Sequence, residues 1–185
     1  MRLLMPEKIV TERLALHKFR YEDSEEIFYT YASKPDATKY MAWPTHQSIE
    51  DSREFLNYAI NSWDRGRDYS FAIRLKHTNR LIGSCGMLNE EGKIQFGYVL
   101  GALHWGNGFA TEATRAMLSQ LKHQEGIFRV CSFVDVENIA SVGVLKKCGL
   151  VEEARLEKWF RFPNQNNEPK DCVLFKLPFE NSNRL

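Results

Sequence analysis

The segment that most constrains this chain is a glycine-containing turn between a strand pattern and a helix pattern. It reads Trp105-Gly106-Asn107-Gly108-Phe109-Ala110-Thr111, follows the strand-like run Lys93–Leu100, and leads into a helical pattern that starts near Gly108. Small residues let backbone N–H groups approach an anion, and the first turn of a helix offers unpaired donors and a positive dipole end. The turn is therefore typical of a pyrophosphate site, although an ordinary glycine-rich bend would carry the same pattern.

Two better-known phosphate motifs are excluded by the residues around the second glycine. A P-loop would place Lys-Ser or Lys-Thr there, whereas this chain has Phe109-Ala110. A dinucleotide fingerprint would place Gly or Ala where Thr111 stands, in a tight turn directly off the strand. Here five residues separate Leu100 from Gly106.

Strand and helix patterns are interleaved along the chain without strict alternation. This predicts an α/β (α+β) fold in which a mixed sheet carries helices on both faces, and we expect one domain over residues 1–185. The expected strands are Ile9–Phe19, the hairpin Tyr69–Leu75 with Arg80–Leu88, Lys93–Leu100, Arg129–Val134, a long strand from Leu150, and Asp171–Leu177. The expected helices start at Asp23 or Ser24, at Ser48 with Asp51, near Gly108 and at Asn138.

Composition narrows the possible partners. The formal net charge is +1, so no global basic field is available for direct nucleic-acid binding. The start MRLLMPEKIV lacks the apolar run of a signal peptide, and no segment is apolar enough to span a membrane, so a cytoplasmic location is expected. Four separated cysteines without a C-x-x-C pair indicate reduced thiols and no metal site.

Five stretches in chain order carry a resemblance to one family. They are TERLAL at 11–16, YMAWP at 40–44, the strands LIG at 81–83 and FGYVL at 96–100, WGNGFATEA at 105–113, and NIASVGVLKKCGL at 138–150. They resemble the GNAT superfamily (Gcn5-related N-acetyltransferases) in the form of its ribosomal-protein acetyltransferase branch. The similarity extends over about residues 9 to 177.

The resemblance implies a mostly antiparallel sheet splayed between Lys93–Leu100 and Arg129–Val134, with acetyl-CoA wedged between these strands. The pantetheine arm would pair with the backbone near Tyr98, Val99 and Leu100, and the pyrophosphate would rest on the amides of Gly106, Asn107, Gly108, Phe109, Ala110 and Thr111. Asn138 would cap its helix and reach the pantetheine. Independently, Gly97 inside its strand indicates a β-bulge or a close backbone approach.

The implied reaction is direct attack of a neutral primary amine on the thioester, which needs an oxyanion donor, a base and an acid. A backbone N–H near Val99 or Leu100 is the candidate oxyanion donor. Many family members place a Tyr acid where this chain has Leu145, so Ser141 is the candidate acid, unless its hydroxyl only bonds the helix or the pantetheine.

The base is harder to assign because the position where many relatives carry Glu is Gln95. Glu168, in the loop 164–169, is the candidate base by resemblance, and Glu90 and Glu91 are rivals. Each of the three is equally compatible with a solvated loop carboxylate. Glu112, in the first turn of its helix, suits the helix dipole and is expected to be structural.

The acceptor is expected to be a protein N-terminal amine, such as that of a ribosomal protein, or a small amine. Tyr40, Met41, Trp43 and Trp63 either line its pocket or belong to the core. An acyl-CoA-binding sensor or partner module with little turnover is the alternative function, which Gln95 and Leu145 favour. By resemblance the chain is a monomer or a homodimer.

Overall fold

A single eight-stranded sheet organises the computed structural model, which describes residues 1–122 and 124–178. Its strand order is β1-β2-β3-β4-β5-β6-β8-β7, and every neighbouring pair is antiparallel except β5 with β6. This confirms the predicted mixed, mostly antiparallel sheet. The strands are β1 Lys8–Val10, β2 Leu14–Lys18, β3 Asp68–Leu75, β4 Leu81–Glu90, β5 Lys93–Leu100, β6 Arg129–Asp135, β7 Val151–Arg161 and β8 Pro169–Lys176.

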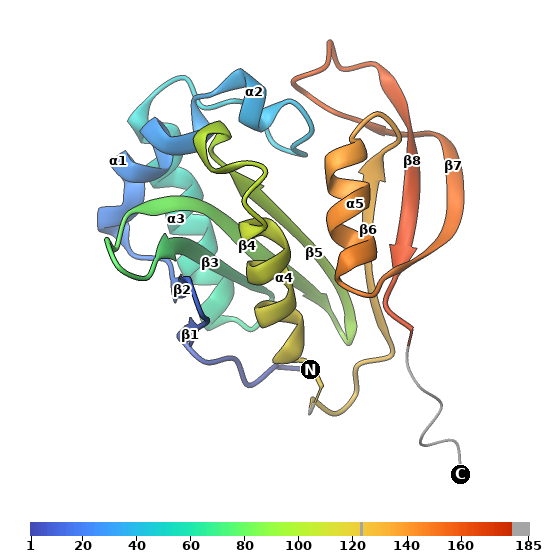
Figure 1. The fold of residues 1–185 in the computed structure, drawn as a ribbon, viewed down its shortest axis with the longest axis horizontal. Coiled ribbons are helices and arrows are strands. Elements are labelled where there is room, and N and C mark those ends of the chain that lie inside the picture. The colour runs from blue at the N-terminus through green and yellow to red at the C-terminus, as the bar shows by residue number, and fades with distance from the viewer. Residues whose placement is uncertain (123, 179–185) are drawn as a thin grey trace.

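Helices cover both faces of the sheet, as predicted. In Figure 1, α4 and α5 lie on one face, while α3 lies on the other with α1 and α2 beside it. The α-helices are α1 Ser24–Ile27, α2 Pro35–Thr38, α3 Ile49–Asp64, α4 Phe109–Ser119 and α5 Ile139–Lys147; short 3-10 or π turns are η1 Tyr21–Asp23, η2 Phe28–Ala32 and η3 Ala102–His104. None of the helices in the described ranges is long and apolar enough to cross a membrane.

The sheet is splayed between β5 and β6. These strands pair only from Lys93 with Arg129 to Gln95 with Cys131, although β5 continues to Leu100. At the end of the pairing, Ser132 Oγ donates a hydrogen bond to the Phe96 carbonyl at 2.9 Å. Beyond it, the edge of β5 that faces β6 has no strand partner, and Figure 1 shows the two halves of the sheet diverging there with α5 beside the opening.

Two sequence expectations about strands were wrong. The segment Ile9–Phe19 is not one strand but the antiparallel pair β1 and β2, because the Thr11 hydroxyl bonds both the N–H and the carbonyl of Leu14 and closes a turn between them. Gly97 forms no bulge, since the β4–β5 register is unbroken where it faces Gly86. A side chain at Gly97 would meet no atom within 4 Å, so this glycine instead borders open space.

Helix α3 begins at the capping motif that the sequence predicts and packs on the sheet through its apolar residues. Ser48 and Asp51 form the expected capping box, and Asp51 Oδ2 accepts from the N–H groups of Ser48 at 3.0 Å and Gln47 at 2.6 Å. Leu56 and Ala59 pack the helix against the sheet. Its last turn contributes Trp63, which is 6% exposed and stacks edge-on with Tyr69 and Phe71.

Glu112 of α4 ties the glycine turn to the β1–β2 turn, about a hundred positions away in the chain. Its Oε1 accepts from the Thr11 hydroxyl at 2.6 Å and the Arg13 N–H at 2.9 Å, and its Oε2 accepts from Arg13 Nε at 2.7 Å. Partial burial opposes ionisation, but these hydrogen bonds prevail and lower the pKa of Glu112. The expected structural role of this residue is therefore confirmed.

We predict that Glu112→Gln lowers the free energy of unfolding by about 1–2 kcal/mol at pH 7, because charge-assisted bonds are lost. A carboxyl whose pKa is lower in the folded state stabilises above its unfolded pKa, and that stability is lost as pH falls through the folded pKa. Urea unfolding should therefore show variant and wild type converging below about pH 4. A difference that stays constant with pH would contradict the assignment, and Glu54→Gln on the exposed face of α3 is the control.

Candidate functional site

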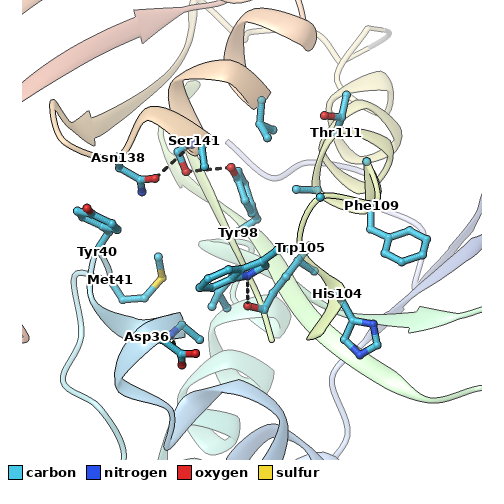
Figure 2. A pocket seen from close by; sticks show the side chains of 18 of the residues that line it. Asp36, Tyr40, Met41, Tyr98, His104, Trp105, Phe109, Thr111, Asn138 and Ser141 are labelled. Carbon is cyan, nitrogen blue, oxygen red and sulfur yellow. Dashed lines mark hydrogen bonds between the residues drawn. The ribbon is translucent and has the colours of Figure 1, made fainter. Parts of the chain in front are cut away.

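A cavity of about 370 Å³ opens beneath the glycine turn, between α2, the end of β5, the start of α4 and α5. Figure 2 shows the side chains around it. Ten of the predicted site residues line it: Tyr98, Val99, Leu100, Gly106, Gly108, Phe109, Ala110, Thr111, Asn138 and Ser141. The structure thus brings together, from three separate elements, most of the residues that the resemblance assigns to a cofactor.

The glycine turn has the backbone conformation that its glycines permit. Gly106 and Gly108 have φ angles of 75° and 78°, in the left-handed region that side chains disfavour. The N-cap residue of α4 is Gly108, which has no side chain to bond the first N–H groups of the helix. These N–H groups are therefore available to a ligand in the cavity. No atom lies within 4 Å of a Cβ built at Gly106.

Hydrogen bonds from Trp105, Asn107 and Arg13 fix the turn. The Trp105 indole N–H donates to the Leu100 carbonyl at 2.9 Å and joins the turn to the end of β5. Asn107 donates to the Trp105 carbonyl at 2.9 Å and accepts from Arg13 through its own carbonyl at 2.9 Å. Asn107 does not line the cavity, unlike the other predicted residues of the turn. Its predicted contact with a cofactor stays a prediction.

Two hydroxyl groups in the lining of this cavity are hydrogen-bonded to each other. The Tyr98 hydroxyl and the Ser141 hydroxyl are 2.9 Å apart and point toward each other in Figure 2. Asn138 Oδ1 accepts from the Ser141 N–H at 3.2 Å, which confirms that Asn138 caps α5 and fixes this serine. Burial raises the pKa of Tyr98 to about 12, so its hydroxyl keeps its proton at neutral pH.

A second cavity, of about 490 Å³, adjoins the first. The two share Tyr40, Met41, Tyr98, Asn138 and Ser141, so they meet at the hydroxyl pair. From there the second cavity extends over the α3 side of β3, β4 and β5. Of the two alternatives that the sequence left open for the four residues, Tyr40, Met41 and Trp43 line this cavity, whereas Trp63 belongs to the core.

The candidate bases lie elsewhere. Glu168 is exposed and lines neither cavity. Glu90 pairs with Lys93, and Glu91 accepts from the amino group of Met1, at the end of β5 opposite the glycine turn. Gln95 lines the second cavity and Leu145 is buried beside it.

Sequence reasoning missed three polar groups of the second cavity. From the sequence, Tyr98 was assigned only to cofactor contact, and no role was given to His46 or to Asp68, which lies just before the expected strand Tyr69–Leu75. His46 Nδ1 lies 2.8 Å from Ser52 Oγ, and burial lowers the pKa of this histidine. Knowledge of how β3, β4 and β5 pair would have placed Asp68 on the same surface as Gln95, because Asp68, Leu88 and Gln95 are cross-strand neighbours.

Comparison with known proteins agrees with this geometry. Residues 13–151 match the family model described as an acetyltransferase (GNAT) domain. The chain belongs to the GNAT family of acetyltransferases. It is 31% identical to an N-acetyltransferase p20 of Bacillus licheniformis, over 83% of this chain and 87% of the relative.

Solved GNAT structures share the fold. A GNAT acetyltransferase from Bacillus anthracis superposes with a TM-score of 0.80 at 26% identity, covering 92% of this chain and 97% of the other. RimJ of Mycobacterium smegmatis, solved in complex with CoA-disulfide, superposes with a TM-score of 0.85 at 18% identity, covering 100% and 93%. This GNAT chain therefore has the architecture of the ribosomal-protein acetyltransferases that its motifs resemble.

The raised pKa of Tyr98 predicts that its ionisation, followed by ultraviolet absorbance, occurs at higher pH than that of an ordinary tyrosine. At pH 10 an ordinary tyrosine is about half ionised, whereas Tyr98 should remain protonated. Tyr98→Phe should therefore leave the tyrosinate absorbance of the protein at pH 10 unchanged. A loss of about half the absorbance of one free tyrosinate in this variant would show that Tyr98 is solvated.

Proposed function

We propose that this protein transfers the acetyl group of acetyl-CoA to a primary amine by direct attack on the thioester. The observation that carries the proposal is the meeting of two cavities at the Tyr98–Ser141 hydroxyl pair. One cavity has the features of an anion site, and the other is open to a second substrate. Such an arrangement suits a reaction between two bound molecules, because it holds their reacting atoms together.

The residues present fit acetyl-CoA as a substrate. Beyond Gln95 the edge of β5 that faces β6 lacks a strand partner, so an extended amide-containing arm can pair with it. The glycine turn and the uncapped N–H groups of α4 suit the pyrophosphate. We assign the pantetheine to the backbone of Tyr98, Val99 and Leu100 with Asn138, and the pyrophosphate to residues 106–111.

The hydroxyl pair suits the acid step. As the amine nitrogen bonds to the carbonyl carbon, the carbon–sulfur bond breaks and the leaving thiolate takes a proton. Ser141 is the proposed donor to the thiolate, and Tyr98, which is protonated at neutral pH, is positioned to replace that proton through their 2.9 Å hydrogen bond. A backbone N–H near Val99 or Leu100 is the proposed oxyanion donor.

The acceptor ammonium loses one proton to become nucleophilic, and its nitrogen loses a second as the amide forms; through solvent, this second proton restores the one that the hydroxyl pair gives to the thiolate. Because Glu168 lies outside both cavities, a proton would reach it through solvent water rather than by direct contact. Glu168 remains the predicted base in that indirect sense. Attack by the small fraction of neutral amine, with release of the proton to water, needs no dedicated carboxylate.

The anion site is tested by a pair of matched glycine variants. Gly106 and Gly149 both have positive φ angles and open space around a built Cβ, so replacement by Glu carries the same backbone strain and charge at each. Only Gly106 lines the cavity. We expect Gly106→Glu to abolish acetyl-CoA binding in calorimetry and Gly149→Glu to retain it. Equal affinity of the two variants would remove the pyrophosphate assignment.

The acid assignment is tested by thiol release across a panel of amines. Ser141→Ala and Tyr98→Phe should each lower kcat by about tenfold to a hundredfold, and the double variant should lose little more, because the two hydroxyls act as a unit. Ser119→Ala and Tyr29→Phe are the controls. A rise in KM for acetyl-CoA with kcat unchanged would show that the pair binds pantetheine instead. Tight CoA binding without thiol release on any amine would favour a sensor.

A further inference from the structure

The floor of the second cavity carries a carboxylate that the proposed reaction does not use. Asp68 begins β3, lines the cavity, and accepts a hydrogen bond from Ser70 Oγ at 2.6 Å. Within residues 1–122 and 124–178 it takes part in no salt bridge. Burial raises its pKa despite the hydroxyl donor, which means that a nearby positive charge would be strongly favourable.

The other groups of the cavity also favour a cation. Among the residues that the structure describes, no Lys or Arg lines it, and the lowered pKa of His46 keeps that ring neutral at pH 7. Aromatic rings of Trp43, Phe55 and Tyr58 contribute walls that attract cations. The second carboxylate, Asp135, is 1% exposed and is satisfied by the Glu137 N–H and by Gln165. Asp68 is thus the cavity's available negative group.

The sheet register places Asp68 away from the reacting centre. Ser70 faces Gly86, which faces Gly97, so Asp68 is two strands and two residues from Gly97. With ordinary strand spacing and rise, the two Cα atoms are about 12 Å apart. A general base must lie within about 3 Å of the proton that it removes, or act through one water. The register thus separates Asp68 from the part of β5 that leads to Tyr98, and the proposed role of Asp68 is binding rather than that of a base.

We propose that the acceptor is a small dicationic amine, of the diamine or polyamine class, whose second ammonium group is held by Asp68 with Ser70. Its first amino group reaches the hydroxyl pair while the aliphatic chain between the two lies along Gly97 and Gly86. The cavity, at about 490 Å³, has the size of a small-molecule site. This inference rests on the proposed function, because it names the substrate class of the same site.

The test compares amines of matched chain length with the protein and acetyl-CoA. The diamines putrescine and cadaverine and the longer spermidine are set against the monoamines butylamine and pentylamine. We expect wild type to prefer the diamines, with spermidine best because of the distance to Asp68. Asp68→Asn should lower kcat/KM for spermidine by about tenfold or more and leave the monoamines unchanged.

Two further variants separate charge from structure. Glu54→Gln removes the same charge from the exposed face of α3 and should change neither amine series. Ser70→Ala keeps the carboxylate but removes its hydroxyl partner, so the preference for diamines should weaken in it without being lost. Should Asp68→Asn fail to fold, the weakened preference in Ser70→Ala and the wild-type preference decide the question. Calorimetric titration of spermidine and butylamine into the CoA-bound protein measures the same preference without turnover.

Several results would overturn the inference. Wild type that binds and acetylates monoamines as well as diamines has no second cation site. Equal losses of kcat for both series in Asp68→Asn, with a shifted pH profile, would make Asp68 the base. A basic peptide that outperforms every small amine would replace the small acceptor by a polypeptide. If no amine releases thiol, the proposed function fails, while the calorimetric preference still decides whether Asp68 binds a second ammonium.

Discussion

The early end of the parallel pairing between β5 and β6 is the constraint on which the site depends. Other strand pairs near it are antiparallel and longer, so they hold the sheet while this one opens after Gln95. An unpaired backbone edge inside a protein needs donors and acceptors from water or a ligand. The opening also brings β5 and α5 to a common cavity, which is why Tyr98 and Ser141 meet although 43 positions separate them.

The glycine turn also depends on a residue near the N-terminus, Arg13. Glycines at positive φ permit the anion site but lose more conformational entropy on folding than other residues do. Arg13 offsets this from outside: it bonds Glu112 and the Asn107 carbonyl, and its guanidinium lies 4.6 Å from the centre of the Phe109 ring. The split of the first predicted strand into β1 and β2 therefore supports the glycine turn, because the turn between these strands carries Thr11 and Arg13.

Features set by neighbours in the chain were predictable, and features set by register were not. The α3 capping box, the Asn138 cap and the glycine turn depend on residues within a few positions, so their signals are complete in the sequence. Trp63 has the same helical spacing as a pocket residue, and only its contacts with Tyr69 and Phe71 place it in the core. The separation of β5 from β6 was predicted from the family resemblance, because no local sequence pattern indicates it.

The dependence on strand register also explains why the residues of the second cavity could not be predicted from the sequence. Asp68 and Gln95 become neighbours of one surface only through the pairing of β3 with β4 and β4 with β5. Once paired, the strands direct alternate residues to one face, and the small residues Gly86 and Gly97 leave that face open: a Cβ at Gly86 would approach Ser70 Oγ to 2.5 Å. A side chain at either glycine would reduce the space beside the Asp68–Ser70 pair.

Local charge gives the two cavities opposite preferences although the whole chain is nearly neutral at +1. The first has the N-terminus of α4 and Lys147 in its wall, and its Asp36 carboxylate is bonded to the Ala37 N–H. The second has Asp68 and, within residues 1–122 and 124–178, no Lys or Arg. An anion is therefore favoured at one end and a cation at the other, with the uncharged hydroxyl pair between. Under the proposed function, this order favours an anionic thioester in the first cavity and a cationic amine in the second, with their reacting groups at Tyr98 and Ser141.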